Sequence, residues 1–350
     1  IVHVTDGVYT AVGYDVSTVS MIVGEDGLII VDTGQAPTRA EETLDQFRKI
    51  SNLPVRAIIL THSHGDHTGG LMAFVDGGNP DIWARDSFGS ERNSGIVRGA
   101  RPVGAAGMEL PPELRINNGI APAMYRPSRR QPPAGNSNQR GLGRDRAGRQ
   151  RSIGRLFGQM RPNKLFGEER RVLEIAGVKL ELVAAPGETQ DQLYVWLPDR
   201  KVLFAGDNFY RSFPNIYPLR GVRRSASDWI SSLKKMLDEK PEFLVGGHTR
   251  PVLGKAAVEE TLGNYHAAVQ FVQDKTLEGM GQGMTPDELV EYVRLPDNLA
   301  DKDYLADYYG SVASAVRAIY SQSVGWFDGN PTSINPLPPK TEAKRMAKLA

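Results

Sequence analysis

The chain has 350 residues, of which 40% are hydrophobic and 24% charged, and its formal net charge is +1. This length allows a buried core and predicts two domains, or one large domain with an appendage. The sequence has no cysteine, which excludes disulfides and thiolate zinc sites, and no apolar run reaches the roughly 20 residues of a membrane-spanning helix. The chain starts at Ile1, which is compatible with removal of an upstream signal peptide or tag and hence with a periplasmic or secreted protein, but the compartment stays open.

The first elements expected along the chain are a hairpin, a helix and a strand. Residues 18–34 contain two apolar runs around Glu-Asp-Gly, and Asp-Gly between such runs predicts a β-hairpin. Residues 36–50 space their apolar side chains at helical intervals. Residues 55–64 then predict a short apolar strand that ends in a polar cluster.

A strongly basic segment occupies residues 125–171. It contains 13 lysines and arginines against three acidic residues, and it is rich in Gly, Pro, Asn and Gln. This composition is typical of a long loop without a core of its own. Two interpretations are open: a solvated excursion, or a lid that attracts anions to a site beneath it.

Two further hairpins are predicted, at residues 170–189 and 193–208, with Ala-Gly and Pro-Asp at their turns. Hairpins that alternate with single helices predict an α/β fold in which two sheets pack together with helices outside them. This sandwich is expected to end near residue 255, where the strand-like alternation stops.

Residues 256–330 are predicted to form a small all-α domain of about three helices. Helix-forming residues fill 254–280, a capping box at 285–288 begins a second helix, and 301–324 predicts a third. The many apolar positions favour a homodimer interface, with a core packed against the sandwich as the alternative. Residues 331–350 are predicted to be an extended C-terminal tail.

The sequence His-Ser-His-Gly-Asp-His follows the strand at 55–61. Its candidate metal ligands His62, His64, Asp66 and His67 lie within six residues and include three of the six histidines of the chain. Imidazole and carboxylate ligands suit zinc or a related divalent ion. The alternate spacing lets the first two ligands aim one way and the last two another, which favours two metals over one closed site.

A two-metal site needs further ligands from elsewhere in the chain. Glu188, Asp207 and His248 each follow an apolar run beside a glycine. Each alone is readily explained as an ordinary turn carboxylate or loop histidine. Together, in this order after the histidine-rich motif, they predict one metal site.

This order of motifs resembles the metallo-β-lactamase superfamily over residues 1–255. The resemblance implies an αββα sandwich with a dinuclear site at one edge of its two sheets. It also implies a division of the ligands, in which one ion is held by His62 and His64, the other by Asp66, His67 and His248, and both by Asp207.

One departure narrows the resemblance to a branch. The usual Pro-Gly-His-Thr of the superfamily is Pro-Gly-Glu-Thr here, so that Glu188 replaces a histidine. In this respect the chain resembles the alkylsulfatases, in which a glutamate serves the first metal. Residues 213–221 and 323–339 also resemble that branch and its helical dimerisation domain. Pro214 stands where the branch commonly has a histidine that can protonate the leaving group.

The resemblance implies a dinuclear hydrolase, with zinc as the expected metal, in which a metal-bound hydroxide cleaves an organic sulfate ester. Asp66 and Asp207 are the candidate catalytic carboxylates. Asn215, Arg220 and Tyr125 are the candidate substrate-binding residues, because their side chains can donate hydrogen bonds to sulfate oxygens. The basic segment would overhang the site and draw anionic esters to it.

Other functions stay open on the sequence alone. A lactonase, a β-lactamase or a phosphodiesterase can use the same fold and metals. A basic nucleic-acid-binding protein is less favoured, because Tyr125, Phe157 and Phe166 are the only aromatic residues among the arginines, too few for stacking on bases. The expected partners are therefore an anionic small-molecule ester and a second copy of the chain.

Overall fold

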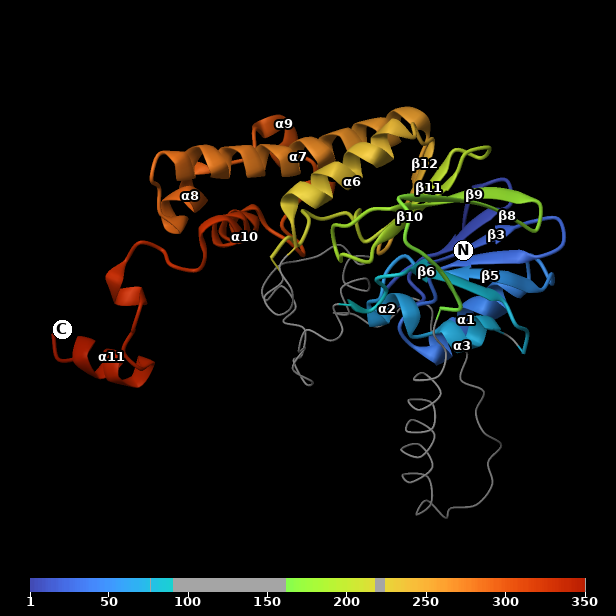
Figure 1. Ribbon diagram of the computed structural model, residues 1–350, viewed down its shortest axis with the longest axis horizontal. Helices are drawn as coiled ribbons and strands as arrows, with labels where there is room; N and C mark the ends of the chain where they lie inside the picture. Colours follow the sequence, from blue (N-terminus) through green and yellow to red (C-terminus); the bar gives the residue numbers. More distant parts are fainter. Residues whose placement is uncertain (76, 91–161, 218–223, 350) are drawn as a thin grey trace, which may run out of the picture.

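The part of the chain described by the computed structural model comprises residues 1–75, 77–90, 162–217 and 224–349 (Figure 1). Most of the basic segment, including Tyr125, lies outside these residues, and so does Arg220. No helix within the described ranges is long and apolar enough to cross a membrane.

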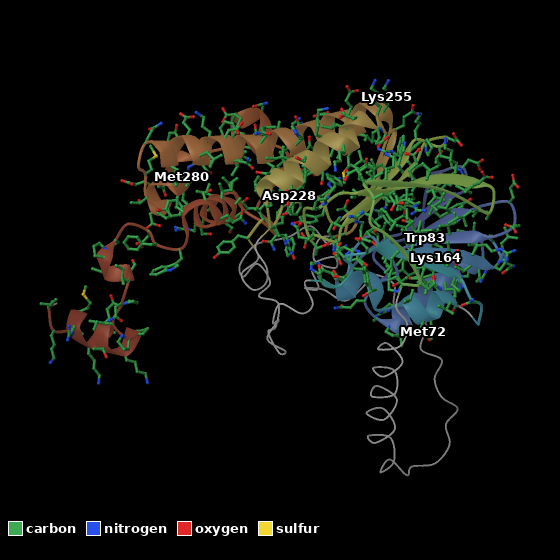
Figure 2. The ribbon with its side chains drawn as sticks, in the orientation of Figure 1. Met72, Trp83, Lys164, Asp228, Lys255 and Met280 are labelled. Atoms are coloured by element: carbon green, nitrogen blue, oxygen red, sulfur yellow. The ribbon has the colours of Figure 1, made fainter. Side chains whose placement is uncertain are left out.

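Two sheets form the centre of the fold, one of seven strands in the order β1-β2-β3-β4-β5-β6-β7 and one of six in the order β13-β12-β11-β10-β9-β8. The first comprises β1 (Val2–Thr5), β2 (Val8–Ala11), β3 (Val19–Val23), β4 (Leu28–Val31), β5 (Val55–Ile59), β6 (Asp81–Arg85) and β7 (Lys164–Phe166). The second comprises β8 (Arg170–Ile175), β9 (Val178–Ala184), β10 (Leu193–Leu197), β11 (Val202–Gly206), β12 (Phe243–Gly246) and β13 (Val252–Leu253). Figure 2 labels Trp83 and Lys164, which face each other where β6 and β7 pair in parallel.

All three predicted hairpins are confirmed. β3 pairs antiparallel with β4, with Met21 opposite Ile30, and the pairs β8–β9 and β10–β11 are also antiparallel. At the β8–β9 turn, Ala176 and Gly177 have φ values of 51° and 73°. Positive φ at both central residues is what a two-residue hairpin turn of this type requires.

Helices cover the outer faces of both sheets. They are α1 (Pro37–Arg48), α2 (Gly65–Thr68), α3 (Leu71–Val75) and α6 (Ala226–Asp238). On β4, Ile29 and Val31 belong to the core between the sheets, whereas Leu28 and Ile30 pack with residues of α1 and α3. A strand buried on both faces is apolar throughout, as this one is. The predicted αββα sandwich is therefore confirmed.

A helical region follows the sandwich. Its elements are α7 (Lys255–Gly281), α8 (Pro286–Tyr292), α9 (Asp297–Ala300), the short 3-10 helix η2 (Asp303–Leu305) and α10 (Val312–Val324). Lys255 and Met280 mark the two ends of α7 in Figure 2. The predicted capping box is present, because the Thr285 hydroxyl accepts from the Glu288 backbone and the Glu288 carboxylate accepts from the Thr285 backbone.

The helical region shares one hydrophobic core with the second sheet. Leu289, Val293 and Ile319 are buried in the same cluster as Tyr194 of β10 and Trp229 of α6. Most of the apolar positions from which the sequence predicts a dimer interface are therefore covered within the chain. Among the described residues, six of the 15 exposed large apolar side chains lie beyond α10, namely Trp326, Phe327, Ile334, Leu337, Met346 and Leu349.

The prediction of one helix over 301–324 is wrong. Between η2 and α10 the chain bends repeatedly over residues 306–310, and there it is bonded to the sandwich: Phe213 N donates to Ala306 O at 2.9 Å, and Gly310 N donates to Phe213 O at 3.1 Å. A Cβ atom at Gly310 would lie 2.1 Å from Pro214 O, so only glycine fits this approach. Ser311 then caps α10 by accepting from Ser314 N.

The prediction of an extended tail over 331–350 also needs correction. The tail contains the 3-10 helix η3 (Pro331–Ser333) and the helix α11 (Pro339–Met346). Pro339 is the first residue of α11, a position where its missing N–H costs nothing. Figure 1 shows α11 lying apart from the other helices.

Candidate metal centre

The histidine-rich segment begins where β5 ends and continues into the one-turn helix α2. His62 and His67 are fully buried, and His64 and Asp66 are partly exposed. The carboxyl ends of β5, β11 and β12 meet at this edge of the two sheets, so that ligands distant in sequence come together.

Two glycines explain how the segment turns so tightly. A Cβ atom at Gly69 would lie 1.9 Å from Gln35 O, and one at Gly70 would lie 2.1 Å from Thr33 O. The backbone of the motif can therefore rest against the loop that follows β4 only because both positions lack a side chain.

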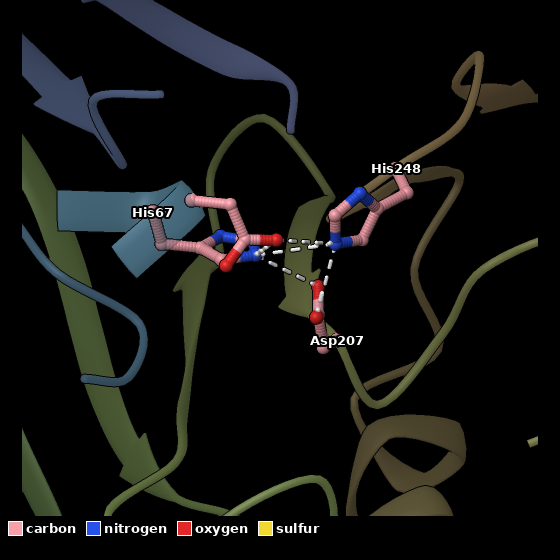
Figure 3. A group of neighbouring side chains, drawn as sticks. His67, Asp207 and His248 are labelled. Atoms are coloured by element: carbon pink, nitrogen blue, oxygen red, sulfur yellow. Dashed lines mark hydrogen bonds and ion pairs between the residues drawn. The ribbon is translucent and has the colours of Figure 1, made fainter. Parts of the chain in front are cut away.

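One group of potential ligands joins α2 to the ends of β11 and β12. The ligand atoms of Asp66, His67, Asp207 and His248 all lie within 4.8 Å of one another. His248 Nε2 is 3.0 Å from Asp207 Oδ2, and His67 Nε2 is 3.2 Å from Asp207 Oδ1 (Figure 3). The two Nε2 atoms are 3.3 Å apart.

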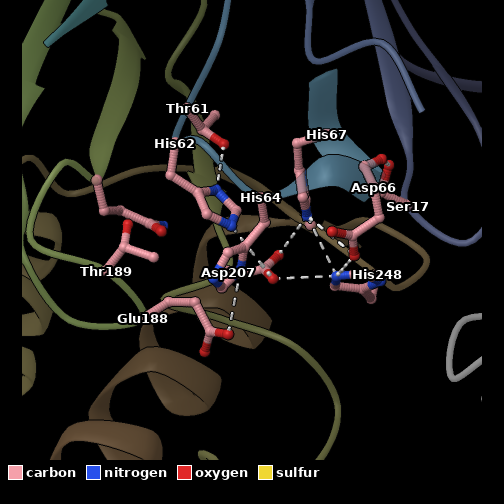
Figure 4. Close-up of polar contacts among 12 residues, drawn as sticks. Ser17, Thr61, His62, His64, Asp66, His67, Glu188, Thr189, Asp207 and His248 are labelled. Carbon is pink, nitrogen blue, oxygen red and sulfur yellow. Dashed lines mark hydrogen bonds and ion pairs between the residues drawn. The ribbon is translucent and has the colours of Figure 1, made fainter. Parts of the chain in front are cut away.

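A second group consists of His62, His64 and Asp207 and obeys the same 4.8 Å limit. Asp207 belongs to both groups, and it is the residue to which the family resemblance assigns the bridging position. Figure 4 shows the two groups side by side around its carboxylate.

The chemistry of these atoms fits a divalent metal. Two imidazole nitrogens 3.3 Å apart and facing carboxylate oxygens form a set in which acceptors outnumber donors. His62 Nε2 is buried and has no hydrogen-bond partner among the described residues, although Asp207 Oδ2 lies 3.7 Å away. A cation supplies the partner that such buried acceptors lack.

Asp32, which the sequence interpretation did not single out, orients the ligands from behind. Its carboxylate accepts hydrogen bonds from Thr61 N and Thr61 Oγ1, both at 2.8 Å, and lies 2.8 Å from His67 Nδ1. A carboxylate at Nδ1 leaves the Nε2 of His67 free to bind a metal. The available signal was its place directly after the apolar β4, in Val-Asp-Thr-Gly.

The charges of the centre are strongly coupled. Burial lowers the pKa of His248, but the charge and hydrogen bond of Asp207 outweigh it and raise the pKa to about 9. Burial acts to raise the pKa of Asp207, yet His248 and His67 hold it well below its usual range. Burial, helped by the neighbouring histidines, lowers the pKa of His62. Asp207 is therefore a fixed negative charge and His62 a neutral imidazole.

Glu188 lies next to the two groups but is bound to an arginine. Its Oε1 is 3.7 Å from His64 Nδ1, while both of its oxygens accept hydrogen bonds from Arg224 at 2.5 Å. Burial acts to raise the pKa of Glu188, whereas the positive charge of the Arg224 guanidinium acts to lower it. Arg224 was missed because "GVRR" carries no local signal of a buried position.

The predicted substrate-binding residue Asn215 lies beside this ion pair. Its backbone N donates to Tyr210 Oη at 2.7 Å, and its carbonyl accepts from Arg224 at 2.7 Å. Its side chain is hydrogen-bonded to the hydroxyl of Tyr309, which comes from the bent, non-helical segment before α10. Burial of that hydroxyl and the charge of Glu188 raise the pKa of Tyr309 to about 12, although 49% of the whole residue is exposed.

Comparison with known proteins finds similar sequences and similar structures. The chain is 33% identical to a linear primary-alkylsulfatase of Pseudomonas sp. over 94% of its own length and 60% of the relative. It is 29% identical to an alkyl/aryl-sulfatase of Saccharomyces cerevisiae over 98% of its own length and 51% of the relative. It aligns with the structure of a stereoselective inverting sec-alkylsulfatase from Pseudomonas sp. with a TM-score of 0.75 and 25% identity. The alignment covers 99% of this chain and 54% of that structure. A metallo-beta-lactamase family protein of Thermus thermophilus, at 19% identity and a TM-score of 0.53, shares the fold. The chain thus spans about half to three fifths of the alkylsulfatases it matches.

Two family models match the chain itself. The alkyl sulfatase dimerisation model matches residues 285–350, from α8 through the tail. The metallo-beta-lactamase superfamily model matches residues 12–248, which begin within the first sheet and end at His248. With the αββα sandwich and the His/Asp ligand groups at its edge, the chain belongs to the metallo-beta-lactamase superfamily.

Proposed function

We propose that the chain is the catalytic part of a hydrolase that cleaves organic sulfate esters, alkyl sulfates above all. The observation that carries this proposal is a pair of metal-ligand groups sharing Asp207, beside the polar residues Asn215, Tyr309 and Arg224. The relatives that match at 28–33% identity are named as alkylsulfatases or as an alkyl/aryl-sulfatase, which supports this class of substrate.

We further propose that the metals are two zinc ions. His62, His64 and Asp207 would hold one, with Glu188 as a nearby carboxylate, and Asp66, His67, Asp207 and His248 would hold the other. Bound zinc lowers the pKa of water and stabilises negative charge that develops on oxygen. Asp207 supplies the shared carboxylate, and Asp32 keeps His67 in the tautomer that leaves Nε2 available.

The residues around Asn215 would hold the sulfate group. Arg220, which lies outside the described residues, and Asn215 remain the proposed hydrogen-bond donors, and Tyr125 is a weaker candidate. Tyr309 adds a phenol that keeps its proton at neutral pH, because its pKa is raised to about 12. It can therefore donate a hydrogen bond to a sulfate oxygen, which Pro214 cannot do.

This arrangement favours attack at carbon. When the C–O bond breaks, the departing sulfate is already a weak base and needs hydrogen-bond donors more than a strong acid. Hydrolysis in oxygen-18 water tests the point: label in the alcohol supports cleavage at carbon, and label in the sulfate supports cleavage at sulfur.

The proposed partner is a second copy of the chain. The match to a dimerisation family over 285–350 supports this, as does the exposed apolar surface of the tail, with Trp326 65% and Ile334 62% exposed. Light scattering at micromolar concentration is expected to give the mass of a dimer, and Trp326→Ser with Phe327→Ser is expected to weaken it.

Turnover by metal-loaded protein tests the proposed reaction against its alternatives. An alkyl sulfate, an aryl sulfate, a phosphodiester, a lactone and a β-lactam are compared side by side. We expect sulfate release from the alkyl ester to be fastest. Activity confined to the phosphodiester, the lactone or the β-lactam would leave only membership of the superfamily.

A further inference from the structure

The loop between β2 and β3, residues 12–18, packs against the metal centre. Thr18 at the end of this loop is only 5% exposed. Its backbone N donates to Gly247 O at 2.8 Å, and its hydroxyl donates to Gly246 O at 2.9 Å. The loop is therefore bound to the turn after β12 that leads into His248.

This loop also holds two members of the His248 position, the ligand group that consists of Asp66, His67, Asp207 and His248. The Nδ1 atom of His248 lies 2.9 Å from Val16 O. A carbonyl can only accept, so Nδ1 is the donor and Nε2 stays available to a metal. The Ser17 hydroxyl donates to the backbone carbonyl of Asp66 at 2.5 Å (Figure 4). Neither contact uses the Nε2 atom or the carboxylate that would face an ion, so both are compatible with a bound metal.

Asp15 fixes the loop from its middle. Its Oδ1 accepts from Val16 N at 2.8 Å, and its Oδ2 accepts from Gln35 N at 2.8 Å and from Ala36 N at 2.9 Å. Ala36 is the cap residue of α1 and supplies no side-chain hydrogen bond of its own, so the carboxylate lies where the helix dipole favours negative charge. A Cβ atom at Gly34 would lie 2.8 Å from Asp15 Oδ2. The loop is thereby held closely against the start of α1.

The segment after β4, residues 32–36, holds a third member of the His248 position. Thr33 N and Thr33 Oγ1 donate to His67 O at 2.8 and 2.9 Å, and the Asp32 carboxylate lies 2.8 Å from Nδ1 of the same histidine. Asp15 therefore joins two segments that between them contact three of the four members of this group.

We propose that Asp15 is a positioning residue for the His248 position. It holds residues 12–18 against the start of α1, and the loop in turn fixes the backbone of Asp66 and the ring of His248 for a divalent ion. Thr61, by contrast, lies 3.1 Å from His62 Nδ1 and orients a member of the His62 position. That position consists of His62, His64 and Asp207. The inference rests on the proposed two-metal function and deepens it.

Asp15→Asn tests the proposal at constant side-chain size. Both oxygens of the aspartate accept N–H groups, whereas an asparagine has one acceptor oxygen and turns an NH₂ group toward the remaining donors. We expect one of two Zn²⁺ ions to bind about tenfold more weakly, as on loss of a hydrogen-bond partner of a metal ligand, and the other to bind as in wild type. Calorimetric titration of metal-free protein measures both affinities, and the visible absorption of bound Co²⁺ reports on ligand geometry.

A double-mutant cycle assigns the affected position. In a His64→Ala background only the His248 position is complete, and there Asp15→Asn is expected to weaken Zn²⁺ binding about tenfold. In a His248→Ala background only the His62 position is complete, and Asp15→Asn is expected to change the affinity by no more than about twofold, the scatter for independent sites. A role of Asp15 limited to general stability would weaken binding alike in both backgrounds.

Two further variants serve as a second test and as the control. Ser17→Ala removes the hydrogen bond to Asp66 O and is expected to weaken the His248 position by a smaller factor than Asp15→Asn. Asp26→Asn makes the same change at an exposed carboxylate that pairs with Arg56 in the β3–β4 turn, and it should alter neither affinity. Thermal melts of each metal-free variant show whether it folds.

Unchanged Zn²⁺ affinity in folded Asp15→Asn, equal weakening in both backgrounds, or weakening confined to the His62 position would each overturn the proposal. If Asp15→Asn does not fold, wild-type affinity of the His248 position in Ser17→Ala would overturn it instead. Because the titrations need no substrate, their failure is distinguishable from failure of the sulfatase assignment, which the turnover comparison decides.

Discussion

The sandwich and the helical region meet at the metal centre but contribute to it differently. The sandwich provides every member of the two ligand groups, from the ends of β5, β11 and β12. The helical region provides no ligand to either group. It brings Tyr309 to Asn215 and holds the backbone of Arg224 through Gln322. We infer that binding of the ions depends on the sandwich, whereas handling of the substrate depends on both regions.

The inferred division of roles between the sandwich and the helical region is tested most strongly at Asp207, the residue common to both ligand groups. Asp207→Ala is expected to remove at least one ion and to lower kcat/KM by more than the roughly 10- to 100-fold that loss of an outer-shell partner costs. Metal analysis after saturation and dialysis, together with turnover of an alkyl sulfate, measures both effects. Asp81→Ala, which removes an exposed carboxylate near Lys164, is the control, and two bound ions in the Asp207 variant would contradict the bridging role.

The shared core of the two regions is tested next, at Leu289 of α8. This side chain is fully buried, and a Cβ atom placed at Gly279 of α7 would lie 2.5 Å from its Cδ2. Leu289→Ala is expected to cost about 2–5 kcal/mol of unfolding free energy, because the buried side chain leaves a cavity. Urea unfolding followed by circular dichroism measures it. A variant as stable as wild type would show that α8 is not part of the core, and metal stoichiometry should not change.

Tyr309 separates ion binding from substrate handling. Tyr309→Phe removes the hydroxyl while keeping the ring that packs against Tyr210 at 5.4 Å. We expect kcat/KM for alkyl sulfates to fall about tenfold, the value of one hydrogen bond to a charged group, with both ions retained. Loss of an ion, or unchanged kinetics, would place Tyr309 outside the role proposed for it.

The smallest effect is expected at the capping box of α8, far from the ions. Thr285→Ala removes the hydroxyl that accepts from Glu288 N and is expected to cost about 1 kcal/mol of stability. Thr285→Ser, which keeps the hydroxyl, should be close to wild type. Differential scanning calorimetry of the three proteins gives the shift, and turnover of folded protein should be the same in all.

The sandwich and the residues supplied by distant segments also differ in how well the sequence predicts them. The sandwich, its hairpins and the grouping of histidines and aspartates are encoded by local signals, such as Asp-Gly turns and ligands spaced along six residues. Arg224 and Tyr309 carry no such signal, because their positions follow from packing between segments distant in the chain. The break between η2 and α10 did carry a local signal that the prediction passed over, because Gly310 disfavours a helix interior and Ser311 favours an N-cap. The close contact of Gly310 with Pro214 then fixes the break.

The non-helical segment at residues 306–311 has a consequence for protein engineering. It connects the helical region to the 212–215 loop by two backbone hydrogen bonds, so a chain that ends before residue 306 would lack Tyr309, which we propose to contact the substrate. Under the proposed function, exchange of residues 307–309 is expected to change ester selectivity without altering a member of either ligand group. Libraries confined to these positions, with Gly310 held constant, would explore specificity at little risk to the ion-binding scaffold.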